Sequence, residues 1–215
     1  KEGHFKKTVS PSPLTQGELD SIPITYANNG LIGTPGKFNQ VTYVSARGCD
    51  RHCAFCAVGS ESIRAKSISA VVRDIEVLLN MGFLRISIED NFFVHSILRT
   101  SEICEALAEI RHRRNDSLTW DCQTRVESLA CKDTIEIMAK AGCAAVYIGV
   151  EALHPDQLLD LNKTQNPTKY LKTLIKLVVP SLLDTDIECY LNRQFGLPGE
   201  IEKKERITLE ILKSF

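Results

Sequence analysis

The chain has 215 residues and a formal net charge of −1, with 43% hydrophobic and 25% charged residues. This length allows one sizeable domain with a full core, and the composition is that of an ordinary globular protein. A near-zero net charge gives no bulk attraction to nucleic acid or to an anionic membrane. The basic cluster from Arg111 to Arg114 falls at an expected helix end, where cations complement the helix dipole. We therefore expect no nucleic-acid or membrane partner.

The cysteine content and the start of the chain bear on the compartment. Eight cysteines would indicate a disulfide framework only in a much shorter secreted chain. No apolar stretch follows the first residues, so no signal peptide is predicted, and we expect a reducing, cytoplasmic compartment. The chain starts with Lys1 and stops in mid-pattern at Phe215, so we interpret it as a piece of a longer polypeptide.

Two regions are predicted from the order of the elements. Residues 1–40 are expected to be an irregular extension, because Pro11, Pro13, Pro23 and Pro35 fall among Ser, Thr, Asn and Gly. In residues 41–215, strand-like apolar runs alternate with helical stretches. Strands are predicted at about 41–45, 84–88, 118–123, 144–150 and 186–195. Helices are predicted at about 67–81, 100–113 and 132–141, as a pair over 155–179, and from about Ile201 onward.

This alternation predicts an α/β fold with a parallel sheet and right-handed crossovers. An open doubly wound sheet and a barrel both fit the order. No Gly-rich dinucleotide fingerprint follows the first strand, which weighs against the open sheet. In parallel β/α folds the site lies at the carboxyl ends of the strands. Polar residues follow the second to fifth strands at these ends, namely Glu89, Asp90, Asn91, Gln123, Arg125, Glu151, Asn192 and Gln194.

The loop after the first strand carries Cys49, Cys53 and Cys56 in the spacing C-x3-C-x2-C, with Phe55 just before the last cysteine. Three thiolates can hold three corners of a four-iron cluster, whereas clusters that only transfer electrons normally have four. One iron is then open to a substrate or cofactor. The alternative is a zinc site, but zinc sites usually pair such a unit with a second Cys or His pair, and none follows.

The motif resembles the signature of the radical S-adenosylmethionine (SAM) superfamily. The resemblance implies a partial (β/α)6 barrel, of which five β-α units are visible, with the sixth beyond Phe215 or lost. It implies a [4Fe-4S] cluster on the three cysteines, with SAM bound at the open iron and cleaved to a 5′-deoxyadenosyl radical. Phe55 would lie at the adenine side of SAM. A flavodoxin- or ferredoxin-like electron donor is implied as a partner.

Other segments extend the resemblance. Glu89-Asp90-Asn91 stands where the family often has Gly-Gly-Glu, so Glu89 or Asp90 would accept the amino group of SAM; an ordinary turn is the alternative. Arg125 would suit the SAM carboxylate, against a surface ion pair with Glu127.

Gly149-Val150-Glu151 resembles the family's Gly-Ile-Glu, which would place Glu151 at the ribose or the methionine end of SAM; helix capping is the alternative. Gln123 and Gln194 are also expected to contact the cofactor. The run from Gly196 to Glu200 resembles a Gly-Leu-Pro-Gly-Glu turn that approaches the adenine side.

The motif pattern is nearest to cobalamin-binding and methylthiotransferase-like branches. It leads to the hypothesis of a radical methyltransferase, with cobalamin as an additional cofactor and with no substrate assigned. A non-catalytic zinc- or cluster-binding module, or a degenerate member of the family, is the alternative. The remaining five cysteines lack paired spacing and are expected to be buried apolar residues, and only Cys122, near the top of its strand, lies close to the expected site.

Overall fold

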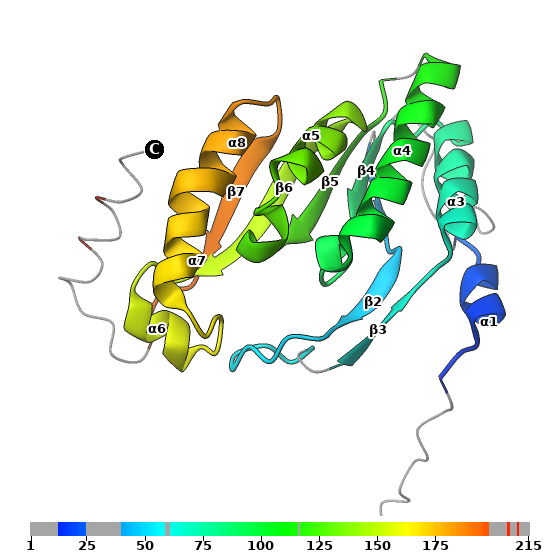
Figure 1. The fold of residues 1–215 in the computed structure, drawn as a ribbon. Coiled ribbons are helices and arrows are strands. Elements are labelled where there is room, and N and C mark those ends of the chain that lie inside the picture. The colour runs from blue at the N-terminus through cyan, green and yellow to red at the C-terminus, as the bar shows by residue number, and fades with distance from the viewer. Residues whose placement is uncertain are drawn as a thin grey trace, which may run out of the picture.

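The computed structural model describes residues 13–24, 40–58, 61–115, 117–197, 206 and 210. Its centre is a parallel sheet with the strand order β1-β4-β5-β6-β7 (Figure 1). These strands are β1 (Gln40–Tyr43), β4 (Arg85–Ile88), β5 (Thr119–Thr124), β6 (Cys143–Glu151) and β7 (Glu188–Arg193). Each crossover between neighbouring strands contains helix, which is the arrangement expected of β-α units.

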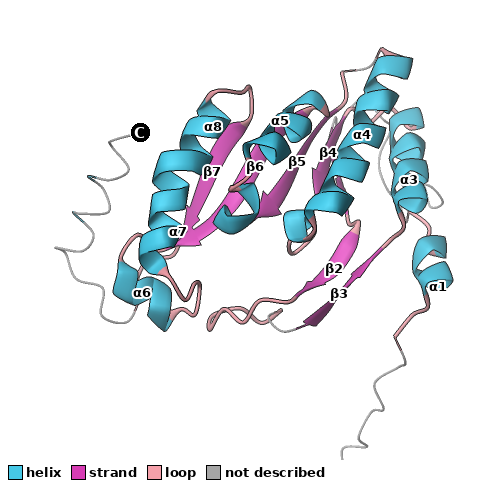
Figure 2. Ribbon diagram, viewed as in Figure 1, coloured by secondary structure: helices cyan, strands magenta, loops and turns pink. Residues whose placement is uncertain are grey.

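The helices gather on one side of this sheet (Figure 2). They are α3 (Ile68–Asn80), α4 (Ile97–Arg114), α5 (Lys132–Lys140), α6 (Pro155–Asp160), α7 (Pro167–Thr173), the π-helical turn η3 (Leu174–Val178) and α8 (Val179–Leu183), with short 3-10 turns η1 (Phe93–His95) and η2 (Val126–Leu129). The core fills the space between the two layers, with Ile75, Ile86, Trp120 and Val146 at most 1% exposed. No helix in the described ranges is long and apolar enough to cross a membrane.

Local sequence explains the helix ends. Ser67 caps α3 by accepting a hydrogen bond from the Ala70 amide, and Val71, Ile75 and Leu78 form its buried stripe. Gly82 follows with φ +93°, a left-handed conformation that glycine adopts without steric cost. The helix predicted over 67–81 is therefore confirmed with both caps.

The predicted α/β class and all five parallel strands are confirmed as well, whereas the helix predicted from Ile201 lies outside the described residues.

Two elements differ from the sequence prediction. Gln16–Ser21 forms helix α1 inside the stretch expected to be irregular, because Thr15 and Glu18 make a reciprocal capping box. The cysteine segment does not begin as a loop: β2 (Ala46–Cys49) pairs antiparallel with β3 (Glu61–Ala65). The irregular prediction is wrong for α1, and the loop prediction is wrong for the hairpin. The three cysteines therefore start from an ordered strand rather than from a free loop.

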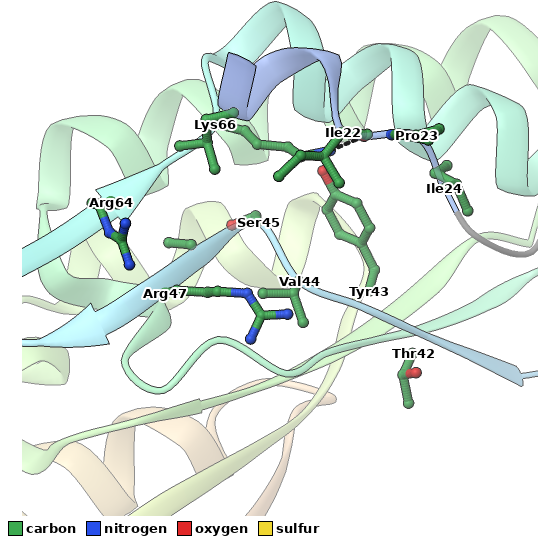
Figure 3. A pocket seen from close by; sticks show the side chains of 12 residues that line it. Ile22, Pro23, Ile24, Thr42, Tyr43, Val44, Ser45, Arg47, Arg64 and Lys66 are labelled. Atoms are coloured by element: carbon green, nitrogen blue, oxygen red, sulfur yellow. Dashed lines mark hydrogen bonds between the residues drawn. The ribbon is translucent and has the colours of Figure 1, made fainter. Parts of the chain in front are cut away.

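The base of this hairpin is fixed by a buried cation. Lys66 Nζ contacts Asp74 Oδ2 at 2.6 Å and donates to the Ile22 carbonyl at 2.9 Å. Figure 3 shows Lys66 extending toward Ile22 at the rim of a cavity of about 380 Å³, with the ring of Tyr43 beside it. Tyr43 also donates to Asp74. The segment after α1, the end of β1 and helix α3 are thus tied to the hairpin that carries Cys49.

Candidate functional site

The cysteine loop lies at the carboxyl edge of the sheet and is held there by the turn that follows α6. Cys49 ends β2, and Cys53 and Cys56 follow in the loop, with Cys56 the most exposed. The Ala54 amide donates to the Leu161 carbonyl at 2.9 Å, and Asn162 Nδ2 donates to the His52 carbonyl at 2.7 Å. A loop that begins at β2 is therefore ordered by residues about 110 positions later.

The donor set of this loop fits an iron–sulfur cluster with three protein ligands. No three or more His, Cys, Asp and Glu side chains of the described ranges converge on a single metal ion. Thiolates that bind different irons of one cluster need not converge in that way, because each coordinates its own corner. The three cysteines are all free thiols, and two of them are only partly exposed. Phe55 lies between them in sequence and is 41% exposed.

Arg125 connects the cysteine loop to the sheet. Its Nη1 lies 3.3 Å from Cys53 Sγ, and its Nη2 donates to the Lys163 carbonyl at 2.6 Å. Although burial opposes it, the pKa of the guanidinium is raised by the Glu127 carboxylate and by Cys53. The ion pair with Glu127 exists at 3.3 Å and is half-buried, because the Arg125 residue is 8% exposed while the Glu127 side chain is 43% exposed. Nε of Arg125 is buried with no hydrogen-bond partner among the described residues.

Glu151 is the centre of a second group of contacts. Lys163 Nζ lies 3.1 Å from its Oε1, and Gln194 Nε2 donates to its Oε2 at 3.1 Å. The Gln194 amide also donates to the Glu151 carbonyl. Glu151 has φ +70°, a left-handed conformation that is costly for a residue with a side chain. His154, not Glu151, occupies the N-cap of α6, so the helix-capping alternative for Glu151 is wrong.

Lys163 was not predicted as a site residue. It is 5% exposed. Its Nζ donates to Glu151, and its carbonyl accepts from Arg125. Burial and the neighbouring Arg125 charge lower its pKa, while Glu151 opposes this shift. A lone lysine in the turn after a helix gives no periodic signal, and a buried lysine is rare unless it is paired. Only the structure shows that this lysine has a carboxylate partner.

Gly149 makes room for this pair. A Cβ at position 149 would lie 2.7 Å from Glu151 Oε1 and 3.0 Å from Lys163 Nζ. Its carbonyl accepts a hydrogen bond from Tyr170 Oη at 3.1 Å. The glycine of the Gly-Val-Glu segment is thus explained by the close approach of the Lys163–Glu151 ion pair.

The segment Glu89-Asp90-Asn91 divides into two roles. Asp90 is 1% exposed, and its carboxylate accepts from the Ser45 amide at 2.6 Å and from the Ala46 amide at 2.8 Å. Asn91 Oδ1 accepts from the Gly48 amide at 3.2 Å. Both side chains therefore fix the hairpin. Burial raises the pKa of the Asp90 carboxyl, although the hydrogen bonds from Ser45 and Ala46 oppose this effect.

Glu89 instead faces the open side of the sheet. Its carboxylate accepts from Gln123 Nε2 at 2.9 Å and lies 3.0 Å from Ser87 Oγ, and it remains exposed. Asn192 lies on β7 beyond these residues and is also exposed. Cys122 points the other way, into the core, where burial raises its pKa. Of the turn from Gly196 to Glu200, residues 198–200 lie outside the described residues, and Gly196 has φ +74°.

Comparison with known proteins agrees with this geometry. The profile of the Radical SAM superfamily matches residues 43–179. The tryptophan 2-C-methyltransferase of Streptomyces laurentii is 28% identical over 192 residues, which cover 78% of this chain and 31% of that protein. The ribosomal protein uS12 methylthiotransferase RimO of Thermotoga maritima is 26% identical over 178 residues, which cover 78% of this chain and 39% of that protein. The chain thus spans about a third of the length of the curated relatives it matches.

Solved structures of the radical SAM methyltransferase TsrM from Kitasatospora setae share the fold. The form with tryptophan substrate and a SAM analog matches with a TM-score of 0.72 at 20% identity, and the match covers 81% of this chain and 34% of that one. A second form of TsrM contains cobalamin and a [4Fe-4S] cluster. These matches confirm the partial-barrel fold, and enzymes of the matched superfamily use a [4Fe-4S] cluster and SAM. Because the family profile covers more than half of its residues, this chain belongs to the radical SAM superfamily.

Proposed function

We propose that this chain is the cluster- and SAM-binding core of a radical SAM enzyme, with Cys49, Cys53 and Cys56 as the three cluster ligands. The observation that carries the proposal is the contact chain from Cys53 through Arg125 and Lys163 to Glu151 at the carboxyl edge of the sheet. When bound, the cluster supplies an open iron for SAM and the electron that cleaves its sulfonium to a 5′-deoxyadenosyl radical, which abstracts hydrogen from the substrate. A small external electron donor of the flavodoxin or ferredoxin type belongs to the proposal.

The protein side chains position SAM around that iron. Glu89, rather than Asp90, is assigned to the amino group of SAM, because its carboxylate is exposed while Asp90 is occupied by backbone amides. Gln123 fixes the Glu89 carboxylate. Arg125 places a positive charge beside Cys53, where it stabilises the thiolate and faces the carboxylate end of SAM.

The other end of SAM is assigned to the second group of contacts. Glu151 and Gln194 stand together at the ends of β6 and β7, and both are only partly exposed, so they can meet the ribose hydroxyls or the methionine end of SAM. Lys163 holds the Glu151 carboxylate in place. Phe55, exposed on the cysteine loop, offers an apolar surface to the adenine side.

Methyl transfer is the reaction class that the comparisons favour. The relatives include a methyltransferase and a methylthiotransferase, and TsrM, which shares the fold, contains cobalamin. We infer that residues 41–215 are the core of such an enzyme and that cobalamin, if used, is bound together with parts of the whole protein beyond this core.

Electron paramagnetic resonance of the anaerobically reconstituted, dithionite-reduced chain tests the proposal. We expect a reduced [4Fe-4S] signal that changes when SAM is added. Cys53→Ala should lose the cluster, while Cys131→Ser, which alters an exposed cysteine at the start of α5, should keep it. A signal indifferent to SAM would indicate a degenerate site. Stoichiometric zinc without iron after anaerobic purification would favour the non-catalytic alternative.

A further inference from the structure

The face of the sheet that points away from the helices is polar. Side chains alternate along a strand, so in-register residues of parallel strands share a face. One row across all five strands contains Thr42, Ser87, Asp121, Ala145 and Glu188. The next row contains Gln123, Tyr147 and Tyr190, with Glu89 bonded to Gln123. In closed β/α barrels this inner face is usually packed with bulky branched apolar residues. Polar side chains here leave this face of the open sheet without such an apolar filling.

An aromatic platform stands at one side of this face. The rings of Tyr147 and Tyr190 stack with their centroids 4.9 Å apart and their planes 15° apart. Tyr190 is 44% exposed, so one ring face remains accessible. Its hydroxyl donates to Glu188 Oε2 at 2.6 Å, which fixes the ring and brings a carboxylate to its edge. Such a surface favours a second planar group, or a cation above the ring.

An incompletely bonded carboxylate stands on the neighbouring strands. Asp121 is 3% exposed and accepts from Ser87 Oγ through Oδ1, whereas its Oδ2 has no hydrogen-bond partner within the described ranges. Among the described residues, the cation that pairs with it is Arg85, whose Nε lies 3.8 Å from Oδ2, beyond hydrogen-bond distance. A buried acceptor without a donor is costly, so this atom calls for an N–H or ammonium group.

The two features lie close enough to act together. Asp121 and Glu188 lie in the same row, with only the small side chain of Ala145 on the strand between them. Neighbouring strands are about 4.8 Å apart, so the backbones of these two residues are about 10 Å apart. The pKa of Tyr190 is raised by its hydrogen bond to Glu188, and the charge of Arg85 opposes this rise, in keeping with a shared face. Even with Glu89 assigned to SAM, the carboxylates of Asp121 and Glu188 share this row, and among the described residues the ion pair at Asp121 is with Arg85. Two carboxylates beside this one ion pair favour a positively charged ligand.

We propose that this inner face binds the substrate, and that the substrate joins a planar ring to a protonated amine. The ring stacks on Tyr190, and the amine reaches the carboxylates of Asp121 and Glu188. This inference rests on the proposed function, because it takes the radical formed above the sheet to act on a ligand held by the sheet.

Ligand titrations followed by saturation-transfer NMR test the charge and the ring separately. Three probes share a phenyl ring and differ in charge: 2-phenylethylamine, 2-phenylethanol and 3-phenylpropionate. We expect the amine to bind at least about tenfold more tightly than the acid, with the alcohol between them. 2-Cyclohexylethylamine, which keeps the charge but not the planar ring, should bind more weakly than 2-phenylethylamine.

Substitutions then locate the site. Asp121→Asn keeps the shape and removes the charge, and it should weaken amine binding at least about fivefold, as should Tyr190→Leu. Tyr190→Phe keeps the ring and should retain most of the binding. Asp133→Asn, at an exposed position on α5 behind the sheet, is the matched control and should change nothing.

The same samples separate the two proposals, because their response to SAM is recorded by paramagnetic resonance. Amine binding that is lost in Asp121→Asn, with an intact SAM response, supports the inference. Equal binding of amine and acid, or no saturable amine binding below about 10 mM, overturns the ligand class and leaves the SAM site standing. Amine binding to a cluster that ignores SAM overturns the assignment of this ligand as a substrate.

Discussion

The cysteine segment is held at two places, and the two anchors differ in kind. At its base, Asp90 and Asn91 accept hydrogen bonds from the hairpin backbone, and Asp90 is buried whereas Asn91 is exposed. Toward its tip, the contacts are made by charged side chains: Arg125 contacts Cys53, and Lys163 contacts Glu151. The base fixes where the loop starts, and the tip places a positive charge beside Cys53. Substitutions at the base should therefore change folding, and substitutions at the tip should change cofactor binding.

Asp90→Ala gives the largest expected effect. It leaves the Ser45 and Ala46 amides and the Ser45 hydroxyl without their acceptor in a buried site. Each unsatisfied group costs about 1–3 kcal/mol, so the free energy of unfolding should fall by about 3 kcal/mol or more in urea denaturation. A loss below about 1 kcal/mol would contradict a structural role for the base.

Lys163→Met should show that the tip of the cysteine segment affects SAM binding rather than cluster content. The substitution removes the partner of Glu151, whose side chain is 12% exposed, and we expect a loss of about 2–3 kcal/mol because the carboxylate keeps some contact with water. Cluster content, measured as iron per chain, should stay the same, while the concentration of SAM needed to change the paramagnetic signal should rise about tenfold. Lys163→Arg should restore part of this response, and a normal SAM response in Lys163→Met would dissociate the ion pair from SAM binding.

Gly149→Ala should have a smaller effect at the same end. The added methyl group would press on the Glu151 carboxylate and the Lys163 ammonium, and overpacking of this kind costs about 1–3 kcal/mol. Gly17→Ala is the matched control, because a Cβ there meets nothing within 4 Å and lies in helix α1. Thermal unfolding of the two variants measures the difference. Equal midpoints would show that the ion pair can move aside.

The smallest expected effect is the contribution of Asp90, at the base of the hairpin, to the pH dependence of stability. The pKa of Asp90 is raised above its ordinary value of 3.8, so the folded chain binds this proton more readily than the unfolded chain does. The contribution of Asp90 to the free energy of unfolding is therefore fully present below pH 3.8, and it is lost as the pH rises through the pKa of Asp90 in the folded chain. Asp90→Asn should remove that part of the slope of unfolding free energy against pH. An unchanged slope would mean that other carboxyl groups cause it.

Much of the fold could be predicted because its signals are local. The apolar run at β6 and the stripe of α3 are visible in the sequence, and so is the three-cysteine spacing. The hairpin escaped prediction because β2 and β3 are four and five residues long, pair across the cysteine loop and contain an irregularity between Arg47 and Cys49. Helix α1 did have a local signal, the Thr15–Glu18 capping box, which the prolines around it outweighed.

The site was predicted less completely, because a residue's role depends on the face it occupies. Glu89 and Asp90 are neighbours in sequence, and alternation along β4 sends them to opposite faces, with Glu89 on the side of Ser87 and Asp90 on the side of Ile88. Strand alternation alone could have separated them. Lys163 could not have been found in this way, because its partner Glu151 lies on a different element and the turn between them has no period.

The contact between Asn162 and His52 also sets an order of events during synthesis. It joins residues 110 positions apart. At about 5–20 residues per second, the cysteine loop leaves the ribosome roughly 5 to 20 seconds before its anchor exists. Throughout that interval, the three thiols belong to a nascent chain whose sheet is incomplete. This contact can form only after Asn162 has been made, so loading of the proposed cluster onto the ordered loop comes late, when most of the barrel core has already been translated.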